Sequence, residues 1–285
     1  MGVIQKDLRP RYYNFYMAVI RQLTINALLE AITPSEALGD PYRPTLCLDG
    51  AILIDAMTQI LADTNKDFLS SATFAITQMY ETCEACISDK DRFIQFPILR
   101  YMMESVTNLC WGPSWFARLG GANGLIMIIR IYPVSLIEAY LHSITEGLIE
   151  VIVGLSDEIG SGASDHAQTA IKTLHEKMLK VFQIKCIHLT IFQEYDVVND
   201  PKGYVATMLR VYLPVLFTAQ ENARNIVWNF ICSFEKDFKG PPMKDLLAKH
   251  MDIINHHKSM FLSEELNKRK NFSGNFLIPR LHVHE

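Results

Sequence analysis

The chain has 285 residues, of which 49% are hydrophobic and 20% are charged, and its formal net charge at pH 7 is -4. These proportions lie near globular averages and argue against disorder over most of the length. The charge gives no bulk attraction to nucleic acid or to an anionic membrane. The most apolar run, residues 125–134, is interrupted by Arg130 and Pro133 and is too short to span a bilayer.

The cysteines are too widely spread for a disulfide-stapled secreted domain. There are six of them in 285 residues, and only Cys83 and Cys86 lie close together. A small secreted scaffold has a much higher density of cysteine, so reduced thiols in the cytosol or nucleus are expected.

The first half of the chain has the periodicity of amphipathic helices. Apolar residues recur mostly three and four positions apart, which places them on one face of a helix. A Pro-containing break at residues 40–44 and a charged turn at residues 88–92 separate these stripes. The stripes predict helices over residues 12–28, 48–61, 66–87 and 96–109, the last with Pro97 in its first turn, where proline is tolerated.

The segment Trp111-Gly-Pro-Ser-Trp-Phe-Ala-Arg-Leu-Gly-Gly-Ala-Asn-Gly124 combines two tryptophans, a proline and four glycines between two apolar helices. No nucleophile, metal set or phosphate loop accompanies it, so this composition favours a packed corner in a helical stack. The predicted structural joint consists of Trp111, Trp115, Phe116, Gly120 and Gly121. If Trp115 is a buried anchor of this joint, truncation to alanine costs roughly 3–5 kcal/mol.

The second half continues the helical pattern. Pro133 separates two apolar stretches, the glycine-rich residues 160–164 form a loop, and Ser164 or Asp165 is expected to cap the helix that follows. Pro214 is expected to kink or shorten its helix. The predicted helices cover residues 119–132, 134–155, a stretch from the loop to about residue 181, and residues 204–217, 219–238 and 243–256.

Roughly eleven helices joined mostly by short turns predict an all-α fold, a HEAT-like α-solenoid in which neighbouring helical pairs cover each other's apolar faces. No fixed sequence period is visible, which argues against tetratricopeptide or ankyrin repeats. It is compatible with HEAT units, whose roughly 40–47 residues follow a loose pattern. We expect residues 1–267 to form the helical repeat region and residues 268–285 a flexible tail.

Several short motifs resemble chemical sites but lack the context that such sites need. Cys83 and Cys86 have metal-like spacing, yet no second pair of ligands matches, and they fall late in a predicted helix. The glycines at 120–124 follow a helical segment rather than the buried strand of a phosphate loop. His256 and His257 lack a third ligand at helical spacing. We therefore expect no catalytic, metal or cofactor site.

A family resemblance is visible in the middle of the chain. Asp91-Arg-Phe-Ile-Gln-Phe-Pro-Ile-Leu-Arg-Tyr101, then Cys110, then Trp115-Phe-Ala-Arg-Leu-Gly-Gly121 resembles a segment of the transformation/transcription domain-associated protein (TRRAP) family. There a charged turn, a Pro-Leu-containing helix, a Trp-Tyr-Ala-Lys-like corner and a Gly-Gly pair occur in the same order. Phe116 and Arg118 replace the tyrosine and lysine of that corner. The resemblance covers about residues 45–180 and includes residues 148–174.

The resemblance implies that the chain is a slice of a much larger scaffold. Family members carry a long HEAT-type solenoid, a helical FAT region and a kinase-like domain without catalytic residues. They act in nuclear histone acetyltransferase assemblies of the SAGA and NuA4 type and as docking surfaces for transcription activators. A non-enzymatic nuclear segment with protein partners is therefore expected, with no direct nucleic acid, membrane or small-molecule substrate. The alternatives are an unrelated HEAT-type adaptor in transport or signalling, and an all-α enzyme.

Overall fold

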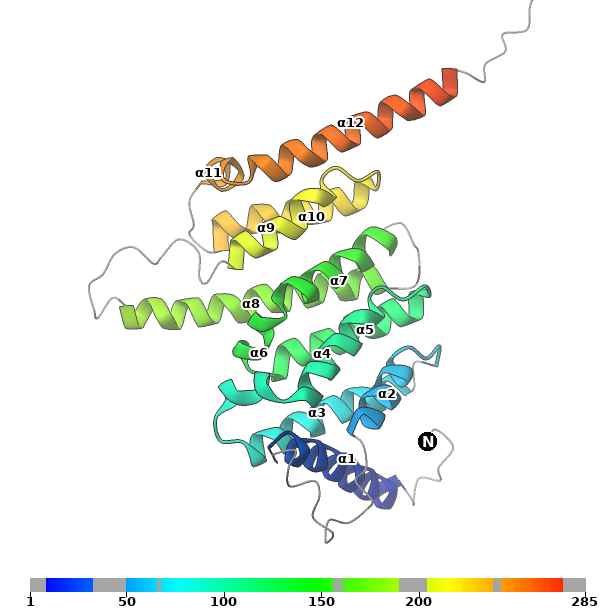
Figure 1. Ribbon diagram of the computed structural model, residues 1–285, viewed down its shortest axis with the longest axis vertical. Helices are drawn as coiled ribbons and strands as arrows, with labels where there is room; N and C mark the ends of the chain where they lie inside the picture. Colours follow the sequence, from blue (N-terminus) through cyan, green and yellow to red (C-terminus); the bar gives the residue numbers. More distant parts are fainter. Residues whose placement is uncertain are drawn as a thin grey trace, which may run out of the picture. The chain divides into compact units, whose positions relative to one another are not determined.

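The computed structural model describes residues 9–32, 50–65, 68–155, 160, 162–189, 204–237 and 242–273, which are shown as ribbons in Figure 1. Throughout this described part the regular secondary structure is helical, and no strand occurs in it. This confirms the all-α prediction. The chain divides into two compact units, Met1–Val198 and Asn199–Glu285, and each is described by itself.

The first unit contains eight α-helices and one 3-10 helix in its described residues. They are α1 Arg9–Ile32, α2 Gly50–Leu61, α3 Leu69–Cys86, the 3-10 helix η3 Lys90–Gln95, α4 Pro97–Leu109, α5 Trp115–Ile131, α6 Val134–Ala139, α7 Leu141–Leu155 and α8 Ala163–Leu189.

Three antiparallel helical pairs form a stack in this unit (Figure 1). Helices α2, α4 and α7 each pack against the helix that follows in their pair, which is α3, α5 and α8 respectively. The first members contact each other in the order α2, α4, α7, and the second members in the order α3, α5, α8. The first members begin at Gly50, Pro97 and Leu141, so the pair recurs after 47 and then 44 residues. This spacing is that of HEAT units.

Local sequence signals determine several helix ends. Pro97 stands at the start of α4, where the missing N–H would have had no helical acceptor. Ser114 caps α5 by accepting a hydrogen bond from the N–H of Ala117, and Asp89 caps η3 by accepting one from the N–H of Asp91 at 3.0 Å. Gly160 has a φ of 104°, in the left-handed region that favours glycine, which agrees with the predicted loop before α8.

Some predicted boundaries are wrong. The helix after the tryptophan corner begins at Trp115 rather than at residue 119. The helix expected over residues 134–155 is broken at Tyr140, where α6 ends and α7 follows. Neither Ser164 nor Asp165 caps α8, because that helix already begins at Ala163 and the carbonyl of Gly162 accepts the N–H of His166 at 3.0 Å. The charged turn expected at residues 88–92 is largely a 3-10 helix.

The core of the stack lies between its two layers. α5 contacts α2, α3, α4, α7 and α8, and its buried face includes Leu125, Ile128 and Ile129. Tyr132, just beyond α5, is fully buried, and its hydroxyl donates to the carbonyl oxygen of Ile76 on α3 at 3.2 Å. Burial raises the pKa of the Tyr132 phenol well above its usual value. This long-range hydrogen bond therefore joins two pairs through a neutral hydroxyl.

The second unit is built on an aromatic cluster. Its helices are α9 Tyr204–Val215, α10 Glu221–Asp237, α11 Met243–Ala248 and α12 Met251–Ser273. Tyr212 on α9 stacks on Phe230 and Phe234 of α10 with ring centroids 6.0 Å apart in both cases, and Tyr204 meets Phe234 edge to face. α9 ends one residue after Pro214, as expected. α12 continues to Ser273, beyond the predicted end of the repeat region, and residues 274–285 lie outside the described residues.

Candidate interaction surface

The structure places the two tryptophans of the predicted joint at the surface. Trp111 is 49% exposed and Trp115 is 36% exposed, whereas Phe116 is of intermediate exposure and meets the ring of Trp115 edge to face at 5.8 Å. The expectation of buried tryptophan anchors is therefore wrong. Trp115 occupies the first position of α5, and more than a third of its surface is open to solvent there. Whether the five residues act together as a joint stays a prediction.

The glycines of the same segment are buried at helix contacts. A Cβ atom on Gly120 would stand 1.9 Å from the carbonyl oxygen of Leu61 at the end of α2. On Gly121 it would stand 2.9 Å from the backbone nitrogen and 3.0 Å from the sulfur of Cys110, just after α4. Both glycines permit a backbone approach that a side chain would prevent. The predicted packing role of these glycines therefore agrees with their positions, and the phosphate-loop alternative does not, since both lie inside α5.

Arg118 connects the corner to the next helical pair. Its Nε donates to the carbonyl oxygen of Gly112 at 2.8 Å, and its Nη2 lies 3.8 Å from the carboxylate of Glu150 on α7. The planar guanidinium reaches both acceptors from one side chain, which a single ammonium group does less readily. Cys110 lies close by, and burial raises the pKa of its thiol to about 12, with Arg118 opposing the shift. This thiol is therefore neutral and structural.

Lys177 on α8 caps the end of α5. Its ammonium group donates to the carbonyl oxygens of Ile129, at 2.6 Å, and of Tyr132. A cation at this end of a helix donates to carbonyls that have no helical partner, and it is attracted by the partial negative charge of the helix C-terminus. Partial burial lowers the pKa of Lys177 to about 8, so the side chain is mostly charged at neutral pH.

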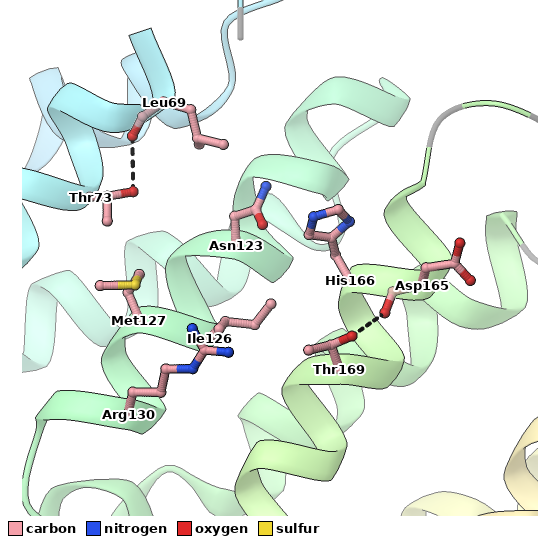
Figure 2. Close-up of a pocket in the computed structure, with 9 residues that line it drawn as sticks. All are labelled: Leu69, Thr73, Asn123, Ile126, Met127, Arg130, Asp165, His166 and Thr169. Atoms are coloured by element: carbon pink, nitrogen blue, oxygen red, sulfur yellow. Dashed lines mark hydrogen bonds between the residues drawn. The ribbon is translucent and has the colours of Figure 1, made fainter. Parts of the chain in front are cut away.

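A groove lies across the second members of the three pairs (Figure 2). Its volume is about 340 Å³. α5 forms the floor, and α3 and α8 form the walls. The lining side chains are Leu69 and Thr73 of α3, Asn123, Ile126, Met127 and Arg130 of α5, and Asp165, His166 and Thr169 of α8.

The groove presents hydrogen-bond donors over an apolar floor. The hydroxyls of Thr73 and Thr169 donate to carbonyls of their own helices, at 2.9 and 2.8 Å, so their hydrogens are already used. The carboxamide of Asn123 and the guanidinium of Arg130 have no hydrogen-bond partner among the described residues. Sequence reasoning missed this groove. The available signal was Arg130, a single cation inside the most apolar run of the chain.

The cysteines and histidines that the sequence suggested as possible ligands do not form a metal-binding cluster in the part of the chain that the structure describes. No cluster of three or more His, Cys, Asp or Glu side chains occurs there. Cys83 is buried, with its pKa raised to about 12 by burial, and Cys86 is exposed, both as free thiols at the end of α3. The rings of His256 and His257 lie 5.2 Å apart on α12. None of the described helices is both long and apolar enough to cross a membrane.

The stacked pairs define the class of protein as an α-solenoid of HEAT type. Residues 1–262 match the family described as the Tra1 HEAT repeat ring region. The match covers most of the chain, so the chain belongs to this family, in agreement with the TRRAP-family resemblance of its sequence.

Relatives of the chain are much longer proteins. It is 32% identical over 189 residues to Transcription-associated protein 1 of Caenorhabditis elegans, which is 65% of this chain and 4% of that protein. It is 23% identical over 274 residues to the Drosophila melanogaster protein of the same name, covering 92% of this chain and 7% of that one. Identity to the human transformation/transcription domain-associated protein is 23% over 187 residues, 61% of this chain and 5% of that protein. The chain thus spans only a small part of its relatives.

Proposed function

We propose that this chain is a non-catalytic scaffold segment of a nuclear histone acetyltransferase co-activator assembly of the SAGA or NuA4 type, and that it supports transcription through protein contacts. The observation that carries the proposal is the family match over residues 1–262, together with relatives named for association with transcription. Its partners are subunits of the assembly and transcription activators.

The physical properties of the described residues support a scaffold. A stack of helical pairs presents long continuous surfaces, since each pair is covered by its neighbours and leaves its outer layer to partners. The groove over α5 contains one arginine and no nucleophile-base pair, and the thiols of Cys83 and Cys110 are kept neutral by burial. These properties suit a surface that binds other proteins.

Affinity purification from nuclear extract tests this proposal. The tagged 285-residue chain is expected to recover acetyltransferase subunits, identified by mass spectrometry. The matched control is Gly120→Leu, whose side chain collides with the backbone at Leu61 and prevents the contact between α5 and α2. Recovery of cytosolic transport factors alone, or equal recovery by the control, would contradict the proposal.

A further inference from the structure

We infer that Cys86 is a thiol modification site that reacts with low-molecular-weight disulfides such as oxidised glutathione, and that Cys83 resolves the adduct by forming a disulfide with Cys86. This inference is independent of the proposed function, because it concerns the chemistry of two side chains of α3. Three observations lead to it: the spacing of the two cysteines, their place at the end of the helix, and the difference in their exposure.

The spacing makes the two cysteines neighbours on the surface of α3. Cys83 and Cys86 lie three residues apart in the last turn of this helix. Residues with this spacing stand about 60° apart around the helix axis, and their Cβ atoms are about 5–6 Å apart. A disulfide needs Cβ atoms about 3.5–4.5 Å apart, so a local shift of about 1–2 Å brings the two sulfurs into bonding distance.

The end of α3 permits this shift. Cys86 is the last residue of the helix, and Ile87 follows it in an extended conformation, with φ of -125° and ψ of 107°. The N–H of Ile87 donates to the carbonyl oxygen of Cys83 at 2.8 Å and closes the last turn. Helix ends open at a much lower free energy than helix interiors. Cys86 can therefore move towards Cys83 while the rest of α3 stays in place.

The difference in exposure decides which thiol reacts first. Cys86 is exposed, whereas Cys83 is fully buried. Burial, and to a smaller extent the neighbouring Cys86, raises the pKa of the Cys83 thiol to about 12, so this thiol stays protonated and shielded from dissolved oxidants. Cys86 therefore takes up the first glutathione. Cys83 then acts within the same chain, where the short distance replaces a second encounter with a dissolved thiol.

The reaction consists of two thiol–disulfide exchanges. The thiolate of Cys86 attacks one sulfur of oxidised glutathione, the bond between the two glutathione sulfurs breaks, and one glutathione thiolate leaves. The sulfur of Cys83 then attacks the sulfur of Cys86, the bond from Cys86 to glutathione breaks, and the proton of Cys83 leaves with the second glutathione. The protein loses two electrons and two protons, which convert one glutathione disulfide into two glutathione thiols.

The disulfide changes a contact between α3 and α5. Cys83 interacts with the phenol of Tyr132, whose hydroxyl donates to the carbonyl oxygen of Ile76. When the side chain of Cys83 turns towards Cys86, it leaves this site in the core, and the last turn of α3 loses its closing hydrogen bond. Hydrogen exchange in the oxidised chain is therefore expected to become faster at the end of α3.

Peptide mapping by mass spectrometry tests the inference on the full 285-residue chain after incubation with oxidised glutathione and alkylation of the remaining thiols. In the parent, the peptide with Cys83 and Cys86 is expected to lose two hydrogens and to carry no glutathione. Cys83→Ala should keep glutathione on Cys86, at an occupancy about tenfold or more above that of the parent, because the intramolecular step is missing. Cys86→Ser should leave Cys83 unmodified.

Cys232 is the internal control, because it is an exposed cysteine on α10 with no other cysteine within one helical turn in the sequence. Its reaction should stop at the glutathione adduct in every variant. Glutathione retained on Cys86 in the parent, an unreacted Cys86 beside a modified Cys232, or a disulfide from Cys86 to any cysteine other than Cys83 would overturn the inference. Modification of Cys83 in Cys86→Ser would do the same. If Cys83→Ala fails to fold, the products of the parent and of Cys86→Ser decide the question.

Discussion

Gly120 shows how a missing side chain determines the distance between two helices. A Cβ atom at this position would overlap the carbonyl oxygen of Leu61, a backbone atom that moves only if α2 moves. We expect Gly120→Ala to destabilise the chain by about 2–3 kcal/mol, because the overpacking cost exceeds the helix propensity that alanine adds. Urea unfolding followed by circular dichroism measures this loss.

The control for this substitution is Gly154→Ala, near the end of α7. The three atoms nearest to a Cβ atom there all belong to the guanidinium of Arg118, the far end of a long side chain, which can shift at the cost of loosening its contacts with Gly112 and Glu150. Its effect should stay within about 1 kcal/mol. Equal losses in the two variants would contradict the assignment of Gly120 as a close-packing position.

Trp115 is expected to contribute less to the free energy of unfolding than the size of its side chain suggests. Because more than a third of its surface is exposed, Trp115→Ala should cost clearly less than the roughly 3–5 kcal/mol of a buried tryptophan. Replacing fully buried Leu125 on the same helix by alanine serves as the comparison and should cost about 2–5 kcal/mol. If Trp115→Ala lowers the free energy of unfolding more than Leu125→Ala does, Trp115 is an anchor of the helical stack after all.

His175 makes the stability of the chain depend on pH. It is almost fully buried on α8, and burial lowers its pKa to about 4. In the unfolded chain the pKa is about 6.5, so the unfolded state binds more protons between these values, and stability falls as the pH falls through that window. The contribution is about 3 kcal/mol between pH 7 and pH 4. His175→Gln should remove this slope in urea unfolding, whereas His166→Gln, at an exposed position, should retain it.

The sequence showed that residues 111–124 are structurally special, but it did not show which of their side chains are buried. The tryptophans and glycines of residues 111–124 stood out by composition, and the structure has a turn between α4 and α5 within this segment. Which of them face the core depends on where α5 begins and how it is rotated, and Ser114 decides the beginning by capping. Arg130 was visible as a charge in an apolar run, but its place in a groove depends on α3 and α8, both distant in sequence.

At the scale of helices, the end of α5 depends on a side chain from α8. Lys177→Met should cost about 1–2 kcal/mol, because the carbonyl oxygens of Ile129 and Tyr132 lose their cationic donor. Lys180→Met, three residues further along α8 at an exposed position, is the control and should be nearly neutral. Hydrogen exchange should also become faster at the end of α5 in Lys177→Met alone. Identical behaviour of the two variants would rule out this capping role.

Helix positions were predictable where a local signal determined them. Pro97 and Pro133 marked helix starts through their fixed backbone geometry, and the structure agrees. The break at Tyr140 carries no glycine or proline, so the periodicity of residues 134–155 read as one helix. There, packing of α6 against η3 competes with continuation into α7, and such tertiary contacts are invisible to a local pattern.

At the scale of the whole molecule, the two compact units should unfold separately. Tyr212→Ala removes a fully buried ring from the aromatic cluster of the second unit and should cost it about 3–5 kcal/mol. Hydrogen exchange read by mass spectrometry should become faster in α9 and α10 and stay unchanged in α5. Trp228→Ala, which truncates an exposed ring on α10, is the control. Faster exchange throughout α5 in Tyr212→Ala would show that the chain unfolds as one cooperative unit.

The order of helical pairs was predictable, since helical stripes joined by short turns leave few other folds. The repeat length was not visible as a sequence period. Intervals of 47 and 44 residues differ because the connections inside the pairs, as well as those with η3 and α6 between the pairs, differ in length. Insertions of this kind leave helix-to-helix contacts intact while they remove any fixed period from the sequence.

The contact of Gly120 with Leu61 has a geometric consequence for helices stacked beyond it. In a solenoid, curvature is the sum of small rotations from one pair to the next. A wider gap at a single contact would tilt every later pair by the same angle, and the resulting displacement would grow with distance along the stack. A substitution at position 120 can therefore shift distant binding surfaces although residue 120 contacts none of them. In a long solenoid, a variant that still folds would place those distant surfaces in the wrong position.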